Sequence, residues 1–161
     1  GKFTEKDKKS NLSYYQKLKN RNEKILIENS NKKYLILRIP SFVDDIPKQN
    51  SLFDKIVVSN ESGNLALKGD YSFYQEFLYS KDFFNVLLEI LIKRNKSSQI
   101  FNISSSKSVN IMELLNPKFH YFSCPRNYPI LDNSKILSYI NFEFHIPKYS
   151  IEDNRIYWIK S

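Results

Sequence analysis

The segment Tyr34–Ile39 constrains the fold more than any other part of the chain. It is a short, nearly continuous apolar run, and Pro40 ends it directly. Such a run is typical of a strand that is buried inside a parallel sheet. Helix-like and strand-like patterns alternate along the rest of the chain, and this alternation predicts an α/β fold.

The remaining elements are predicted from apolar spacing and from turn residues. The clearest helix covers 81–93, where apolar side chains recur at helical spacing: Phe83, Phe84, Leu87, Leu88 and Leu91. Further helices are expected at 12–29 (with Ser10 or Asn11 as N-cap), 51–59, 110–115, 134–140 and 151–159, and strands at 65–67, 77–79 and 99–103. No linker rich in Pro, Gly or Ser divides the 161 residues, so we expect a single domain.

Tyr15 and Lys19 are four residues apart on the first predicted helix. This spacing puts a phenol and an ammonium group on the same face, with the Cβ atoms about 5–6 Å apart. A free tyrosine has a pKa of ~10, and a nearby cation favours its ionised form, so the pair is suited to proton transfer. Because roughly one such pair is expected by chance in this composition, the spacing alone would favour two solvated residues on a polar helix.

The surrounding residues form motifs that occur in a recognisable order. The run from Ser13 to Leu26 contains Tyr-Gln-x-x-Lys-x-x-x-Glu, and it resembles the active-site helix of extended short-chain dehydrogenases/reductases, the NAD-dependent epimerase/dehydratase family. Later segments are similar to that family's motifs in the same order: Tyr34–Pro40, Glu76–Asp82, Phe101–Ser106, Val109–Leu114 and Leu131–Lys135. The resemblance covers nearly the whole chain.

This resemblance implies a fold and a division of the chain. The fold would be the C-terminal portion of a Rossmann-type parallel sheet together with the small substrate-binding lobe. Residues 1–45 would supply the active-site helix and the strand that follows it. Residues 46–161 would supply the remaining sheet elements and the lobe.

The resemblance also implies roles for individual residues. Tyr15 would be the catalytic acid–base, and Lys19 would keep it ionised and hydrogen-bond the nicotinamide ribose, so both also count as cofactor-binding residues. Pro40 would lie along the nicotinamide, and Ser41 would contact the substrate. Gln75 would also contact the substrate, in a position where the family often has an arginine.

Two departures from the family pattern bear on the substrate. Asp44 and Asp45 replace the family's Gly-Pro after the strand, and Gln75 replaces the arginine. The second change removes a phosphate contact, because a guanidinium binds phosphate and a carboxamide carries no charge. These changes affect the expected nucleotide-sugar substrate more than the expected fold.

Glycine content limits what this chain can do with a dinucleotide. It has three glycines, Gly1, Gly63 and Gly69, whereas a Rossmann phosphate turn needs several in close succession. We therefore expect the first dinucleotide-binding half, with the catalytic Ser/Thr, to precede residue 1, unless Gly1 is a cloning remnant. The cofactor would be NAD or NADP, held mainly by that half, and residues 1–161 alone would be inactive.

The formal charge of +8 raises the alternative of nucleic-acid binding. The basic residues are scattered among acidic and amide residues, and the chain is generally rich in Lys, Asn, Ile, Ser, Tyr and Phe. This bias accounts for the charge without a polyanionic partner, so the composition argues against nucleic acid.

The sequence does not support a disulfide, a metal site or a membrane span. Cys124 is the single cysteine, which excludes an internal disulfide and fits a reducing cytoplasm. His120 and His145 have no cysteine or carboxylate at ligand spacing, so no metal is expected. No apolar run approaches the ~18 residues of a membrane span.

Three functional classes therefore stay open. The first is the catalytic and substrate-binding part of an NAD(P)-dependent sugar-nucleotide epimerase, dehydratase or reductase. The second is a truncated, non-catalytic relative that acts as a binding or dimerisation module, because the resemblance implies a homodimer packed through the Tyr15/Lys19 helix. The third is a small basic RNA-binding protein, which steep salt dependence of RNA binding would reveal.

Overall fold

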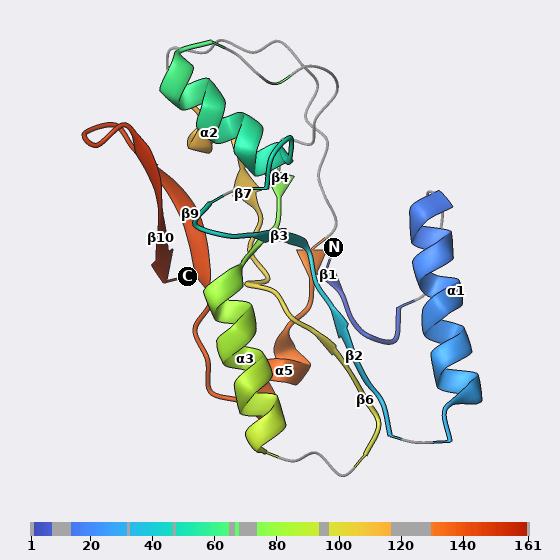
Figure 1. The fold of residues 1–161 in the computed structure, drawn as a ribbon. Helices are drawn as coiled ribbons and strands as arrows, with labels where there is room; N and C mark the ends of the chain where they lie inside the picture. The colour runs from blue at the N-terminus through green and yellow to red at the C-terminus, as the bar shows by residue number, and fades with distance from the viewer. Residues whose placement is uncertain are drawn as a thin grey trace.

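The computed structural model describes residues 2–7, 14–31, 33–46, 48–64, 67, 74–93, 97–116 and 130–160. Figure 1 shows helices α1 and α3 on either side of strands β2 and β6, with α2 and the β9–β10 hairpin toward the other end. In chain order the elements are β1 (Lys2–Phe3), α1 (Tyr14–Asn29), β2 (Leu35–Arg38), β3 (Ser41–Val43), α2 (Leu52–Ser62), β4 (Tyr74–Gln75), β5 (Phe77–Tyr79), α3 (Ser80–Ile92), β6 (Gln99–Asn102), β7 (Val109–Asn110), α4 (Ile111–Leu114), β8 (Ile130–Leu131), α5 (Ser134–Tyr139), β9 (His145–Ser150) and β10 (Arg155–Lys160).

The predicted α/β class with parallel strands is confirmed. Strand β2 pairs with β6 in parallel, from Leu35 opposite Gln99 to Arg38 opposite Asn102. Strands β3 and β5 form a second parallel pair, and β1 and β8 form a third. Strands β4 and β7, and strands β9 and β10, pair antiparallel. The apolar run at 34–39 is therefore a parallel strand, one residue shorter at each end than predicted.

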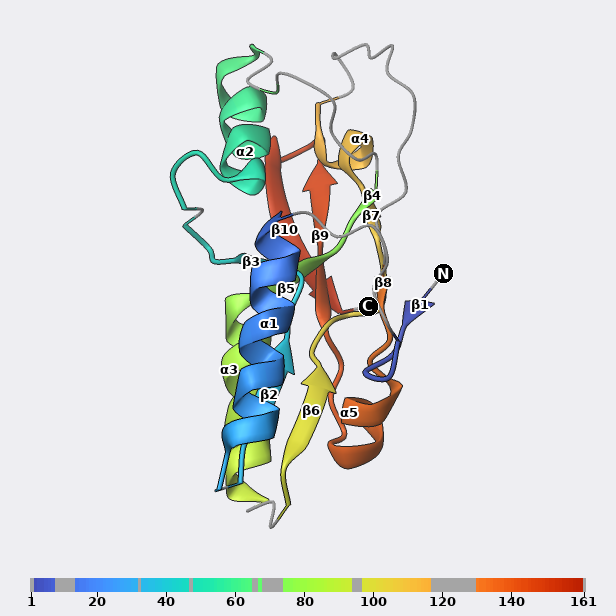
Figure 2. The ribbon, with the colours of Figure 1, turned by 90° about the vertical axis from the view of Figure 1, so that its right-hand side faces the viewer.

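The two faces of the β2–β6 pair carry different helices. Leu35 and Leu37 pack on one face, against a buried cluster to which helices α3 and α5 and strand β6 contribute: Leu78, Val86, Ile90, Phe101, Ile103, Ile136, Ile140 and Phe144. Because side chains alternate across a strand, Arg38 faces the other way, and it pairs with Glu23 of α1. Helices α1 and α3 therefore flank β2 from opposite faces, and in Figure 2 α1 lies in front of β2 while α3 lies behind it.

A second buried cluster lies under α2. It consists of Val43, Phe53, Ile56, Phe77, Val109, Ile111, Leu114 and Leu115. Helix α2 begins after Ser51, whose hydroxyl accepts the backbone N–H of Asp54 at 3.1 Å, and it ends at Gly63 in the left-handed conformation (φ 68°). All of these residues except Val43 belong to the 46–161 part, and the division of the chain at residue 45 stays a prediction.

The sequence predicts a helix at 151–159, and this prediction is wrong. The segment closes a hairpin between β9 and β10, with Asn154 at a positive φ of 51° in the turn. Ile156 and Trp158 pack against the second cluster, while Tyr157 between them is exposed. This period-two alternation of aromatic and β-branched residues favours a strand over a helix once one face has a core to cover.

Helix α3 differs from its prediction in which residues it buries. The spacing correctly predicts the helix, but its buried apolar residues are Val86 and Ile90, while Phe84, Leu88 and Leu91 are exposed. Helix α2 continues to Ser62, three residues beyond its predicted end. Leu67 is not in a strand, and the other two residues of the strand predicted at 65–67, like the N-cap candidates Ser10 and Asn11, lie outside the described residues.

Candidate functional site

Helix α1 carries the candidate catalytic residues, and it is held to the rest of the chain by charged groups. None of its described residues is buried. The guanidinium of Arg38 bonds the Glu23 carboxylate through two of its nitrogens, with Nε 3.2 Å from Oε2, and its Nη1 donates to the carbonyl of Glu5 at 3.0 Å. One arginine thus joins the N-terminal segment, α1 and β2.

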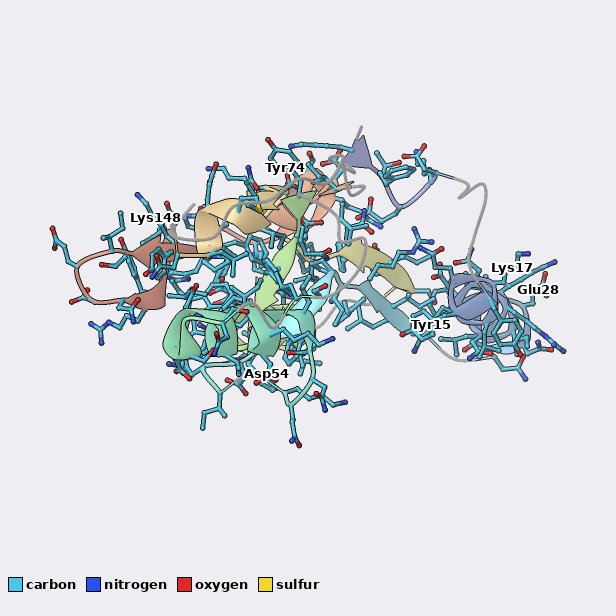
Figure 3. All side chains as sticks on the ribbon, turned by 90° about the horizontal axis from the view of Figure 1, so that it is seen from above. Tyr15, Lys17, Glu28, Asp54, Tyr74 and Lys148 are labelled. Atoms are coloured by element: carbon cyan, nitrogen blue, oxygen red, sulfur yellow. The ribbon has the colours of Figure 1, made fainter. Side chains whose placement is uncertain are left out.

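Tyr15 and Lys19 lie next to each other on α1. Lys19 Nζ is 5.4 Å from the centroid of the Tyr15 ring, over its face. The Tyr15 side chain is 65% exposed, and Figure 3 shows it on the side of α1 nearer to β2, with Lys17 on the far side. The contact is a cation–π arrangement that holds the ammonium close to the phenol. The catalytic role of the pair stays a prediction.

The structure brings together the two candidate substrate residues, which are 34 positions apart in the sequence. The Gln75 carboxamide Nε2 donates to Ser41 Oγ at 2.8 Å and to the carbonyl of Glu76 at 3.3 Å. Gln75 is buried at the end of β4, and Ser41 begins β3 directly after Pro40. The Gln75 side chain is therefore fixed in position, and its amide is directed at the segment that the sequence assigns to the substrate.

A cavity of about 460 Å³ lies beside α1. It is lined by Asp7, Asn20, Glu23, Lys24, Ile27, Glu28 and Arg38. Neither Tyr15 and Lys19 nor Pro40 and Ser41 line it. We expect these four residues to face one cleft, and this expectation stays a prediction.

The two aspartates that replace Gly-Pro bind the start of α3. Ser80 Oγ donates to Asp44 at 2.8 Å, Tyr79 Oη donates to Asp45 at 2.6 Å, and Lys81 Nζ lies 2.8 Å from the other Asp45 oxygen. Hydrogen bonds from Lys81 and then from Tyr79 hold the pKa of the Asp45 carboxyl below its usual value. Asp45 in turn raises the pKa of Lys81, so the cation next to this loop is already paired.

A buried polar cluster next to Gln75 was not predicted from the sequence. Glu76 is 1% exposed, and its Oε2 accepts the backbone N–H of Leu131 at 3.1 Å. Burial raises the pKa of this carboxyl above its usual value. The Asn102 amide donates to the carbonyls of Phe3 at 2.8 Å and Asp132 at 3.1 Å, so it joins β6 to the β1–β8 pair. Sequence analysis identified Glu76–Asp82 and Phe101–Ser106 as family-like motifs. Their spacing along the chain could not predict that they lie next to each other.

His145 has a carboxylate partner that the sequence analysis did not identify. Its backbone N–H donates to Asp82 Oδ2 at 2.5 Å, and its Nδ1 is 2.8 Å from Asp82 Oδ1. Asp82 is buried at the start of α3 and His145 begins β9, so the pair fixes the hairpin to the helix. Within the described ranges, no three His, Cys, Asp or Glu side chains group as metal ligands. His120 and Cys124 lie outside those ranges.

Among the described residues, no helix is both long enough and apolar enough to cross a bilayer.

Comparison with known proteins gives matches in structure alone. No protein-family model matches the sequence, and no curated protein matches it. MoeE5, solved with UDP-glucose and NAD, superposes with a TM-score of 0.72 at 17% identity over 96% of this chain and 56% of its own. The dTDP-glucose 4,6-dehydratase of Bacillus anthracis, solved with NAD, gives 0.72 at 16% identity over 96% of this chain and 53% of its own.

A third match is the UDP-glucuronic acid 4-epimerase of Bacillus cereus, solved with NAD. Its TM-score is 0.66 at 19% identity, over 86% of this chain and 49% of its own. The chain thus spans about half the length of the solved structures that it matches. At these identities the likeness concerns the fold, and this chain has the fold of the C-terminal part of Rossmann-type NAD-dependent sugar-nucleotide epimerases and dehydratases.

Proposed function

We propose that this chain is the catalytic and substrate-binding part of an NAD(P)-dependent sugar-nucleotide epimerase, dehydratase or reductase. The observation that carries the proposal is the contact between Tyr15 and Lys19 on α1, beside a β2–β6 parallel pair. The chain shares its fold with proteins that were solved with NAD, and one of them, MoeE5, was solved with UDP-glucose as well. A phenol next to an ammonium on an exposed helix face is accessible to a substrate hydroxyl.

In this mechanism Tyr15 moves a proton and Lys19 supports it by its charge. The Tyr15 phenolate takes a proton from a sugar hydroxyl, or the phenol returns one to a carbonyl oxygen. The Lys19 ammonium stabilises the negative phenolate oxygen in the step where the proton has left. NAD(P), when bound, supplies the hydride acceptor and donor.

The residues present fit one end of a dinucleotide. Lys19 has an ammonium that can donate to ribose hydroxyls, and Pro40 lies between the end of β2 at Arg38 and Ser41 at the start of β3. A glycine-rich phosphate turn, by contrast, cannot be built from the three glycines of this sequence. We therefore propose that another part of the enzyme binds the pyrophosphate.

Ser41 and Gln75 are the proposed substrate contacts. Their mutual hydrogen bond holds a hydroxyl and a carboxamide in place, and both are neutral groups. Asp44 and Asp45 follow on the same loop, and Lys81 is already paired with Asp45. This local charge favours sugar hydroxyls over phosphate oxygens at Ser41 and Gln75.

The test of the proposal is an assay of the intact enzyme with UDP-glucose, UDP-glucuronic acid and dTDP-glucose. We expect formation of an epimer, a 4-keto sugar or a reduced sugar from at least one of them. Absence of turnover with all three, by an enzyme shown to bind NADH, would contradict the proposal.

Residues 1–161 alone should behave differently. Since most pyrophosphate recognition comes from a glycine turn and a helix N-terminus, we expect no tight NADH binding by this chain. Isothermal titration calorimetry checks this, and micromolar binding would contradict it.

The alternative is a non-catalytic relative that acts as a dimerisation or binding module. It is favoured by the exposed apolar residues of α1, which include Leu18, Ile25 and Leu26. Both proposals allow a homodimer through α1, so the activity assay decides between them.

A further inference from the structure

Gln75 and Glu76 are consecutive residues whose side chains fix one peptide to two different parts of the chain. The Gln75 carboxamide donates to Ser41 Oγ of β3 at 2.8 Å and to the carbonyl of Glu76 at 3.3 Å. The Glu76 carboxylate accepts the backbone N–H of Leu131 of β8 at 3.1 Å. The position of the Gln75 amide therefore depends on where the Glu76 side chain is held.

The Glu76 carboxyl is buried, and one of its oxygens has no hydrogen-bond donor. Oε2 receives the Leu131 N–H, whereas Oε1 has no hydrogen-bond partner among the described residues. A buried, charged oxygen without a donor costs free energy, because water no longer hydrates it. Asn102 lies in the same cluster, and its Oδ1 is also buried without a partner.

The polar groups around Glu76 direct their protons to other acceptors. The hydroxyls of Ser104 and Ser106, each with a single proton, lie 3.1 and 2.5 Å from the carbonyl oxygen of Leu131. Both amide protons of Asn102 go to backbone carbonyls next to the β1–β8 pair. A proton on the Glu76 carboxyl would add a donor where the described residues leave two acceptor atoms without one.

The charged groups around the Glu76 carboxyl only partly offset its burial. Lys2 of β1 is the cation that acts on it. The carboxylate of Glu5 accepts the backbone N–H of Asn102 at 2.9 Å, and that of Asp132 accepts hydrogen bonds from the second residue after it. Burial raises the pKa of Glu76, and the nearby hydrogen-bond donors and Lys2 lower it by less. Glu76 therefore keeps its proton to a higher pH than an exposed glutamate does.

We propose that Glu76 is a proton-linked positioning residue for the nucleotide sugar. While its carboxyl carries a proton, it stays against Leu131 and holds the Gln75 amide at Ser41. When the carboxyl loses the proton, its charge draws it toward water, the peptide between residues 75 and 76 moves, and the contact of Gln75 with Ser41 weakens. The inference rests on the proposed function, in which Gln75 and Ser41 contact the substrate.

Substrate binding and protonation of Glu76 then favour each other. Coupling between two binding events is reciprocal, so a ligand that binds the ordered Gln75 amide must also raise the affinity of Glu76 for its proton. Binding should therefore take up a proton, and the affinity should fall as the pH rises through the pKa of Glu76.

Isothermal titration calorimetry of the intact enzyme with UDP-glucose tests this linkage. We expect Kd to rise about 3–10-fold between pH ~5 and pH ~8, and the measured heat to depend on the ionisation enthalpy of the buffer, as proton uptake requires. Glu76→Gln has a similar shape and does not ionise, so it should abolish both effects. Glu61→Gln, at an exposed residue of α2, is the matched control and should leave both as they are in the unmodified enzyme.

Binding of UDP-glucose that takes up no proton and does not depend on pH would overturn the proposal. An unchanged pH dependence of Kd in Glu76→Gln would overturn it as well, because the titrating group would then be another residue.

Nuclear magnetic resonance tests the coupling of Glu76 to Gln75 without a substrate. In the intact enzyme labelled with ¹⁵N-glutamine, the side-chain amide signal of Gln75 is identified by its loss in Gln75→Met. It should shift with pH at the same midpoint as the ¹³C signal of the Glu76 carboxyl. Gln99, whose amide donates to Ser97 at 2.9 Å, is the control and should not shift. A Gln75 signal that does not follow Glu76 would overturn the proposal even if the Glu76→Gln enzyme does not fold.

The two measurements separate failure of this inference from failure of the proposed function. If UDP-glucose and dTDP-glucose do not bind while the Gln75 signal follows Glu76, the proposed function is wrong, and with it the role of the pair in substrate binding. If they bind without proton uptake, the inference alone is wrong.

Discussion

Helices α1 and α3 flank the same strand from opposite faces, yet they are held in different ways. Helix α3 buries Val86 and Ile90 in an apolar cluster, and Asp82 at its start binds His145. Helix α1 buries no residue, and the Arg38–Glu23 pair attaches it to β2. Helix α3 is therefore held by apolar packing, whereas α1 is held by an ion pair and leaves its side chains exposed, as the role proposed for Tyr15 requires.

The largest effect in this comparison of α1 with α3 is expected at Tyr15 of α1. In the intact enzyme, Tyr15→Phe should lower kcat by about 10²–10⁴-fold, because it removes the group proposed to move the proton. The melting temperature should hardly change, since the side chain is largely exposed. Steady-state kinetics and thermal unfolding check both parts.

Tyr14→Phe is the matched control for this change, because Tyr14 is the neighbouring exposed tyrosine of α1. It should leave kcat unchanged. Lys19→Ala should also lower kcat, because it removes the ammonium that lies 5.4 Å from the centroid of the Tyr15 ring. Near-normal kcat in Tyr15→Phe would leave α1 without its proposed role.

A pair of identical substitutions compares the packing of the two helices. Ile90 of α3 is 2% exposed, whereas Ile25 of α1 is 47% exposed. Ile90→Ala should reduce the free energy of unfolding by about 2–5 kcal/mol, and Ile25→Ala by less than about 1 kcal/mol. Urea unfolding measures both, and equal losses would mean that α1 packs as firmly as α3.

The anchor of α1 should have a smaller effect. Arg38→Met removes the guanidinium that bonds Glu23 and the Glu5 carbonyl, and we expect a loss of about 1–2 kcal/mol for this partly buried pair. Hydrogen exchange should show that the loss is concentrated in α1. Lys24→Ala is the control, since the Lys24–Glu28 pair is exposed and should contribute less than about 0.5 kcal/mol. Unchanged exchange in α1 after Arg38→Met would show that another contact holds the helix.

The smallest expected effect concerns pH. Burial raises the folded-state pKa of Glu76 above the unfolded value of about 4.3, so the folded state binds that proton more tightly. The resulting contribution to stability is complete below pH ~4 and is lost as the pH rises through the folded pKa. Glu76→Gln does not ionise, so its melting temperature relative to the unmodified chain should rise between pH 4 and pH 7. Glu61→Gln, at an exposed residue of α2, should show no such trend.

The sequence predicted the elements whose pattern is local. The run Tyr34–Ile39 predicted a parallel strand, because strands buried in parallel sheets are apolar along nearly their whole length. The spacing of apolar residues predicted α3, because side chains on one face of a helix recur every three to four residues. The segment at 151–159 was predicted wrongly because that prediction also used local spacing alone. Its apolar residues fit a helix on spacing alone, and only the second buried cluster selects the two-residue period that makes β10.

The site shows the same division. Sequence by itself determined that Tyr15 and Lys19 share one side of α1, since residues four apart on a helix are neighbours. Only the tertiary structure decided which distant residues are partners. Gln75 donates a hydrogen bond to Ser41, Asp82 contacts the His145 ring, and Asp45 forms an ion pair with Lys81. These contacts join residues that are far apart along the chain. Contacts of this kind produce no regular spacing of side chains, so they could not be predicted from the sequence.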